Sequence, residues 1–240
     1  GAHHLDPWSR REIKTMSPPV SPARAVQGKS ALFIPALGGN IADAQYQAIV
    51  EKGLAKLSDL GLDIDVALDD PTQFQPDIAT QMMTSNLAAR VRQMSVEAQQ
   101  HLGPGLQSLL GEEEFKSDGV RLQTDAIDRS RTYDRLERVL SNYDFVLTPT
   151  LTAPPPLADP NSDQSVTING NKERINKWWT HLSIANLTGH PAISIPCGID
   201  ANDLPVGLHA IGGWDRDSDL VSLAVASITC FDWTERQPVY

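Results

Sequence analysis

The hydrophobic residues of this chain fall into short separated runs, and their spacing alternates between strand-like and helical. Ala31–Pro35 is apolar and bounded by turn residues, which predicts a buried strand. Apolar residues between 49 and 60 then keep helical spacing, with Asp43 placed to cap the helix and Gly61 to end it. Ile64–Leu68 alternates and predicts the next strand. This strand–helix–strand order is typical of a parallel pair in an α/β sheet.

The middle of the chain is rich in helical patterns. We predict helix over most of 72–110, with a break at Gly103-Pro104-Gly105, and another helix from about Asp118 to Leu140. Phe145–Thr148 predicts a buried strand that Pro149 ends.

The last third begins with residues 152–171, which are rich in Pro, Asp, Asn and Ser and are expected to form a long loop. A helix is predicted from about Glu173 to Asn186. Ala192–Ile195 and Val206–Ile211 are two short strands joined by a hairpin-like turn, and Asp217 opens a final helix to about Phe231. Because the strands are scattered along the chain, we expect one sheet to collect them. The predicted fold class is α/β, with a mixed, mostly parallel central sheet covered by helices.

Composition narrows the classes of partner. The chain has 240 residues, 40% of them hydrophobic, and a formal net charge of −10. An acidic surface repels phosphate backbones, so we expect no nucleic-acid partner. Two cysteines cannot form a disulfide framework, and no apolar run approaches the ~20 residues of a membrane span. We therefore expect a cytoplasmic protein with no membrane association.

Three possible ligand motifs each lack a residue that the motif requires. Gly28-Lys29-Ser30 suggests a phosphate loop, but the required glycine five positions earlier is Ala23. Residues 159–163 begin like a calcium loop, yet the sixth position is not glycine. His3 and His4 have no second ligand pair at a suitable spacing. We therefore expect no metal and no cofactor.

Candidate nucleophiles are scarce. Neither G-x-S-x-G nor S-x-x-K occurs in the chain. Cys197 could act as a nucleophile with His181, His190 or His209 as its base, although its place at the end of an apolar run favours a buried structural thiol. A cysteine hydrolase is therefore kept as an alternative.

Three segments in the last 100 residues occur in an order that is similar to the amidase-signature family. They are Tyr143–Thr150 (YDFVLTPT), Asn186–Gly198 (NLTGHPAISIPCG) and Leu204–Gly212 (LPVGLHAIG), and His209 stands where the family commonly has Gln. Each segment also suits a bland role at a strand end or turn, so the three segments are first a signature of the fold.

Weaker resemblance extends upstream. Gly1–Ser9 (GAHHLDPWS) looks like the family's G-x-x-x-x-D-P segment, and Lys29–Gly39 looks like the strand and loop that follow. We therefore interpret residues 1–240 as the C-terminal part of a single amidase domain, with the N-terminal catalytic half absent.

The resemblance implies an amidase that uses a Ser, a second Ser in a cis peptide bond and a Lys. All three lie in the family's N-terminal half, so no catalytic residue can be carried over to this chain. We expect the parent protein to hydrolyse a small-molecule amide and this chain to need the N-terminal half as its partner. Alone, it should dimerise, aggregate or await that half, so a homodimer is one expected outcome. The alternative is a non-catalytic binding or scaffold module with a degenerate amidase fold.

Substrate-pocket residues are expected where the resemblance meets a strand end, because ligands of α/β proteins bind there. A second group precedes the NLTG segment. Ordinary core packing is the competing interpretation for this second group. The candidate substrate-binding residues are Thr148, Pro149, Thr150, Trp178, Trp179 and His181.

Overall fold

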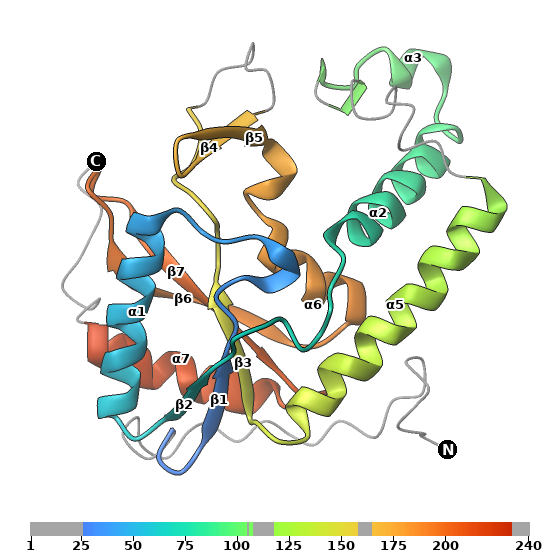
Figure 1. Ribbon diagram of the computed structural model, residues 1–240. Helices are drawn as coiled ribbons and strands as arrows, with labels where there is room; N and C mark the ends of the chain where they lie inside the picture. Colours follow the sequence, from blue (N-terminus) through green and yellow to red (C-terminus); the bar gives the residue numbers. More distant parts are fainter. Residues whose placement is uncertain (1–25, 105, 108–117, 158–164, 232–240) are drawn as a thin grey trace.

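The computed structural model describes residues 26–104, 106–107, 118–157 and 165–231 (Figure 1). The N-terminal segment with His3 and His4 and the acidic residues 159–163 lie outside this part. A five-stranded sheet with the order β2-β1-β3-β7-β6 forms the centre. Its strands are β1 Ser30–Phe33, β2 Asp63–Val66, β3 Phe145–Pro149, β6 Ala192–Ile199 and β7 Pro205–Gly212.

The sheet is mixed. Strand β1 is parallel to both β2 and β3, whereas β7 is antiparallel to both β3 and β6. Only β7 is therefore reversed among these five strands, and the other four point the same way. The predicted class of a mixed, mostly parallel α/β sheet is confirmed.

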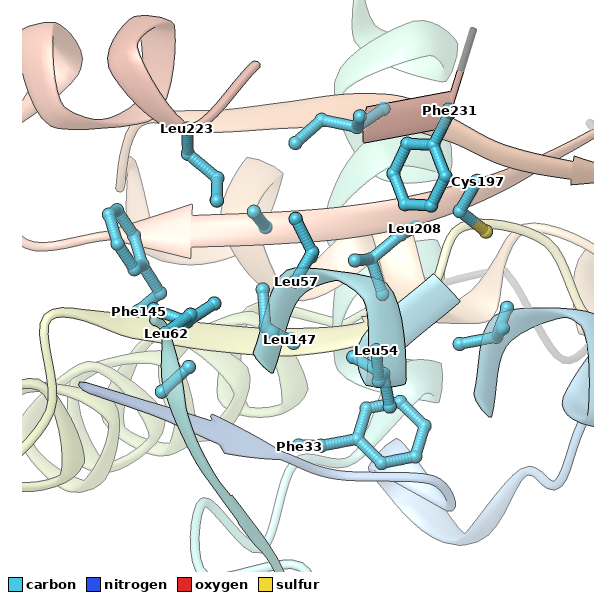
Figure 2. Close-up of a cluster of buried hydrophobic side chains, with 14 of the residues drawn as sticks. Phe33, Leu54, Leu57, Leu62, Phe145, Leu147, Cys197, Leu208, Leu223 and Phe231 are labelled. Carbon is cyan, nitrogen blue, oxygen red and sulfur yellow. The ribbon is translucent and has the colours of Figure 1, made fainter. Parts of the chain in front are cut away.

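Helices cover both faces of the sheet because successive strand residues point to opposite sides. Helices α1 (Ala44–Asp59) and α7 (Asp217–Phe231) pack on the face that carries Phe33, Leu147 and Ala210. Figure 2 shows side chains of this core, with Leu54 and Leu57 of α1 and Leu223 of α7 gathered around the strands.

The opposite face carries a second core. Leu32, Val146 and Ile211 from three neighbouring strands form its floor. The covering helices are α2 (Pro76–Val91), α5 (Gly119–Leu140) and α6 (Ser183–Thr188). A short helix, α3 (Val96–Gln99), follows α2.

Several predicted elements are confirmed with their caps. The side chain of Asp43 accepts a hydrogen bond from the Gln45 backbone N–H at the start of α1, and Gly61 follows its end with φ +99°. Asp118 caps α5 in the same way through the Arg121 N–H. The hairpin of β6 and β7 and the last helix also form as predicted.

Two predictions between residues 152 and 186 are wrong. The expected loop contains strand β4 (Ser165–Ile168), and the expected helix begins instead as strand β5 (Asn171–Arg174). Asn169 and Gly170 between them have φ of +50° and +79°. An Asn-Gly pair with two positive φ angles is the strongest short-range signal for a tight hairpin, and it prevents helix across this point. Two 3₁₀ turns follow, η4 (Ile175–Lys177) and η5 (Thr180–Leu182), so only α6 is α-helical.

The β4–β5 hairpin is attached to the start of α1 by reciprocal hydrogen bonds. The Asn169 N–H donates to Asp43 Oδ2 at 3.0 Å, and the Ala44 N–H donates to Asn169 Oδ1 at 2.9 Å. The two side chains therefore cap each other's backbone across the fold.

We expect Asp43→Ala and Asn169→Ala each to lower the free energy of unfolding by about 1 kcal/mol, as the loss of a helix cap usually does. The double variant should lose less than the sum, because either change alone already breaks the shared arrangement. Urea denaturation checks this, with Lys52→Ala, an exposed position of α1, as the control. Strict additivity would count against the reciprocal cap.

Candidate functional site

A row of polar residues crosses the sheet near the end of β3. Thr148 lies directly opposite His209 of β7, which in turn lies opposite Ser194 of β6. Residues that are directly opposite in antiparallel strands point to the same face. The row therefore lies on the face covered by α2, α5 and α6, next to the apolar floor of the second core.

Two hydroxyl groups meet beside this row. Thr150 Oγ1 and Ser194 Oγ are 2.7 Å apart, and the Thr150 N–H donates to the Gly207 carbonyl at 2.9 Å. A Cβ atom on Gly207 would lie 2.6 Å from the Thr150 hydroxyl and 2.7 Å from that of Ser194. Only glycine therefore leaves room for this pair.

Thr148 and His209 are both buried polar residues. Their exposed fractions are 0% and 3%. Among the described residues, Thr148 Oγ1 and His209 Nδ1 have no hydrogen-bond partner. Burial lowers the pKa of His209 to about 4, and the neighbouring His181 adds to this effect. His209 is therefore uncharged at neutral pH.

His181 links three segments of the chain. Its Nδ1 lies 2.8 Å from the Pro149 carbonyl oxygen and its Nε2 lies 2.8 Å from the Asn40 carbonyl oxygen. Burial lowers the pKa of His181, although both carbonyls oppose this by favouring a second ring proton. A neutral imidazole has one N–H, so only one of the two contacts is then a hydrogen bond. The ring fastens the turn η5 to the end of β3 and to the loop after η2 (Leu37–Gly39).

The two tryptophans have different surroundings. Trp178 Nε1 donates to the Ala153 carbonyl at 2.8 Å, and the Trp178 carbonyl accepts from the Thr152 N–H. Its ring packs edge-on against Trp179, with 6.2 Å between centroids. Trp178 is thus anchored to the chain after β3, and Trp179 stands beside it.

Trp179 lines a groove between α2 and α6, which we call the α2–α6 groove. It consists of an apolar chamber of about 380 Å³ and a polar chamber of about 250 Å³, which share Thr80 and Ser183. Residues of the apolar chamber include Met82, Met83, Leu87, Arg129, Trp179 and Leu187. Residues of the polar chamber include Asn40, Gln75, Asp77, Asn176, Lys177 and Thr180.

The structure brings four of the six predicted pocket residues together. Thr148, Pro149, Thr150 and His181 form one polar cluster at the end of β3, whereas Trp179 lines the groove and Trp178 supports it. Direct contact with a substrate stays a prediction for all six.

Sequence reasoning missed the other half of the site. Ser194 supplies the second hydroxyl of the pair and Gly207 leaves room for it. The methionines of α2 line the groove. Ser194 and Gly207 lie inside the matched segments, so their spacing carried a signal. No sequence pattern marked the methionines as groove residues, because α2 has no clear apolar stripe.

The cysteine alternative finds no support at Cys197. This side chain is 5% exposed, and its thiol donates to the Val206 carbonyl. Burial raises the pKa of the Cys197 thiol to about 12, whereas a nucleophilic cysteine needs a lowered pKa. Among the described residues, no group of three or more His, Cys, Asp or Glu side chains could hold a metal ion. Within the same part of the chain, no helix has the length and apolar character to cross a membrane.

Comparison with known proteins identifies the fold. A family model described as Amidase matches residues 28–221, which is most of the chain. The chain belongs to the amidase family.

Curated relatives within this amidase family match in part. A glutamyl-tRNA(Gln) amidotransferase subunit of Thiobacillus denitrificans is 31% identical over 121 residues, covering 50% of this chain and 23% of that protein. The corresponding subunit of Sulfolobus acidocaldarius is 32% identical over 96 residues, covering 38% of this chain and 17% of that protein.

Solved amidase-family structures match more of the chain at lower identity. A bacterial aryl acylamidase superposes with a TM-score of 0.74 at 20% identity, covering 89% of this chain and 46% of that one. A 6-aminohexanoate cyclic dimer hydrolase gives 0.69 at 15% identity, covering 95% and 52%. These similarities show a shared fold, and the predicted amidase-signature membership is confirmed. The chain spans about half the length of these solved relatives and about a fifth of the curated ones.

His209 should make stability depend on pH. Above pH about 6.5 the ring is neutral in both states; between pH 6.5 and 4 the unfolded chain binds a proton that the native chain excludes. Stability should therefore decrease as the pH is lowered, by about 2 kcal/mol from this group between pH 7 and pH 5. Urea denaturation at both pH values should show a smaller loss for His209→Gln than for the natural chain. An equal loss in both would contradict the assigned burial.

Cys197 should resist alkylation in the native protein, because its thiol is buried and its pKa is raised. Iodoacetamide followed by peptide mass analysis should modify Cys197 only after denaturant is added. Rapid native labelling of Cys197, inhibiting the protein at the same rate, would restore the nucleophile hypothesis. Cys230, which is less buried, serves as the internal comparison.

Proposed function

We propose that the protein acts as an amidase, hydrolysing the C–N bond of a carboxylic amide. One observation carries this proposal: the three matched segments, which are separate in the sequence, converge on one polar cluster. Segment 143–150 contributes Thr150, segment 186–198 contributes Ser194 and segment 204–212 contributes Gly207. A non-catalytic module with the same fold would need the strands and turns of these segments but not a hydroxyl pair where they meet.

Amide hydrolysis needs a nucleophile, a base within hydrogen-bond reach and donors for the oxyanion. The hydroxyls of Thr150 and Ser194 bond to each other, and neither bonds to a base in the described part of the chain. We therefore place this chain in the role of sheet, cover and part of the substrate pocket. The catalytic Ser, cis-Ser and Lys would come from the half of the amidase fold that this chain does not span.

The described residues then divide the work. The hydroxyl pair would border the reacting amide, as polar groups at the end of β3. His181 would hold the Pro149 carbonyl in place, and Trp179 would line the pocket for the substrate body. Each assignment uses a contact at the end of β3 or in the α2–α6 groove, where α/β folds commonly bind ligands.

The partners of this activity are a small-molecule amide and the N-terminal half of the same amidase domain. Names among the relatives include an aryl acylamidase, a cyclic dimer hydrolase, an allophanate hydrolase of Kluyveromyces lactis and a subunit of an amidotransferase. This range supports a common C–N bond reaction and leaves the choice of substrate to the pocket. A cytoplasmic location belongs to the same proposal.

Thr150→Ala in the full-length protein should change substrate preference, because it removes one hydroxyl of the pair while leaving Ser194. We expect kcat/KM to fall about tenfold for some amides and little for others, measured over a panel of aliphatic, aryl and amino-acid amides. Thr167→Ala, an exposed position on β4, is the matched control.

Two results would contradict the proposal. Unchanged kinetics for Thr150→Ala across the panel would remove this residue from the pocket. A folded full-length protein that hydrolyses none of the amides would instead favour the non-catalytic binding module.

A further inference from the structure

The α2–α6 groove has an apolar chamber with unusual side chains. Two consecutive methionines, Met82 and Met83, line it from α2, and the Trp179 indole lines it from the segment before η5. Methionine sulfurs and indole edges make favourable contacts with aromatic rings. The chamber volume of about 380 Å³ exceeds the roughly 150 Å³ in which a dry apolar cavity already holds benzene.

The chamber wall at Trp179 is held in place before any ligand enters. Trp178 is fixed to the chain after β3 by its bond to the Ala153 carbonyl, and it packs edge-on against Trp179. A positioned indole loses little freedom on binding, so its contact area contributes fully to affinity.

The charges along the groove do not suit a cationic ligand. Arg129 is the charged residue among those that line the apolar chamber, and its Nε donates to the Leu187 carbonyl at 2.6 Å. The polar chamber contains one acid, Asp77, and one base, Lys177, whose Nζ donates to Asn40 Oδ1. An ammonium group entering the apolar chamber would lose hydration and meet the like charge of Arg129 there.

A neutral polar group fits the polar chamber better. Asn176 and Thr180 line it with groups that can donate and accept hydrogen bonds, as an amide does. Thr80 and Ser183 line both chambers, so the two chambers lie next to each other.

We propose that the α2–α6 groove selects amides with an aromatic body that carries no ammonium group, which the apolar chamber holds against Trp179 and the α2 methionines. This selectivity rests on the proposed amidase function. It makes Trp179 and Met83 specificity-determining residues, and it disfavours amides of free amino acids.

The test compares benzamide, acetamide and glutamine on the full-length protein, by calorimetric binding and by release of ammonia. We expect the natural protein to prefer benzamide to glutamine by at least tenfold in kcat/KM. Trp179→Ala should weaken benzamide binding at least tenfold and affect acetamide, which has no ring to contact the indole, much less, whereas Trp179→Phe should retain most of the preference. Val120→Ala, an exposed apolar position on α5, is the control.

A second variant guards against misfolding of Trp179→Ala. Met83 is 45% exposed, so Met83→Glu should be tolerated by the fold while placing a carboxylate in the chamber. Benzamide binding should again weaken at least tenfold, with the melting temperature within a few degrees of the natural protein.

The outcomes separate this inference from the proposed function. Benzamide binding that depends on Trp179 and Met83, without hydrolysis of any amide, would contradict the amidase proposal and support the groove proposal. Hydrolysis that prefers glutamine would overturn the groove proposal alone. So would equal effects of both variants on benzamide and acetamide, or no effect on either.

Discussion

Strand β3 imposes the constraint on which the rest of the described structure depends. Both its edges are paired, to a parallel strand on one side and an antiparallel strand on the other, and all five of its residues are buried. Phe145 and Leu147 face one core and Val146 faces the other. The helices on both faces of the sheet therefore pack on cores that include residues of this strand. The polar side chains of the candidate site therefore lie at the end of this strand.

The side chains of the polar cluster at that end are uncharged at neutral pH. Burial lowers the pKa of both His181 and His209, so neither ring carries a charge at neutral pH, and the other polar side chains there are hydroxyls. Such a cluster can orient and recognise an amide, but it offers no strong base. Such a cluster suits the division of labour proposed above, in which this part of the amidase fold recognises the substrate and the other half supplies the reactive groups.

The sequence predicted those elements whose signals are local. Asp43 and Asp118 marked helix starts, and the apolar runs at 31–35 and 145–148 marked buried strands, because caps and burial leave a clear pattern. The stretch 173–186 misled because its apolar spacing resembles a helix, while Asn169-Gly170 had already turned the chain into a hairpin. The site was half predictable: Thr150 stood out at a strand end, but its pairing with Ser194 depends on strand register, which no local pattern gives.

The mutual capping of Asp43 and Asn169 joins positions that are 126 residues apart in the chain. Each side chain supplies what the other's backbone lacks, so replacing one leaves the other with an unmatched partner. Across an amidase-family alignment, these two positions should therefore change together even though neither belongs to a recognisable motif. Such paired substitution would trace the attachment of the hairpin through evolution, independently of the three segments that define the family.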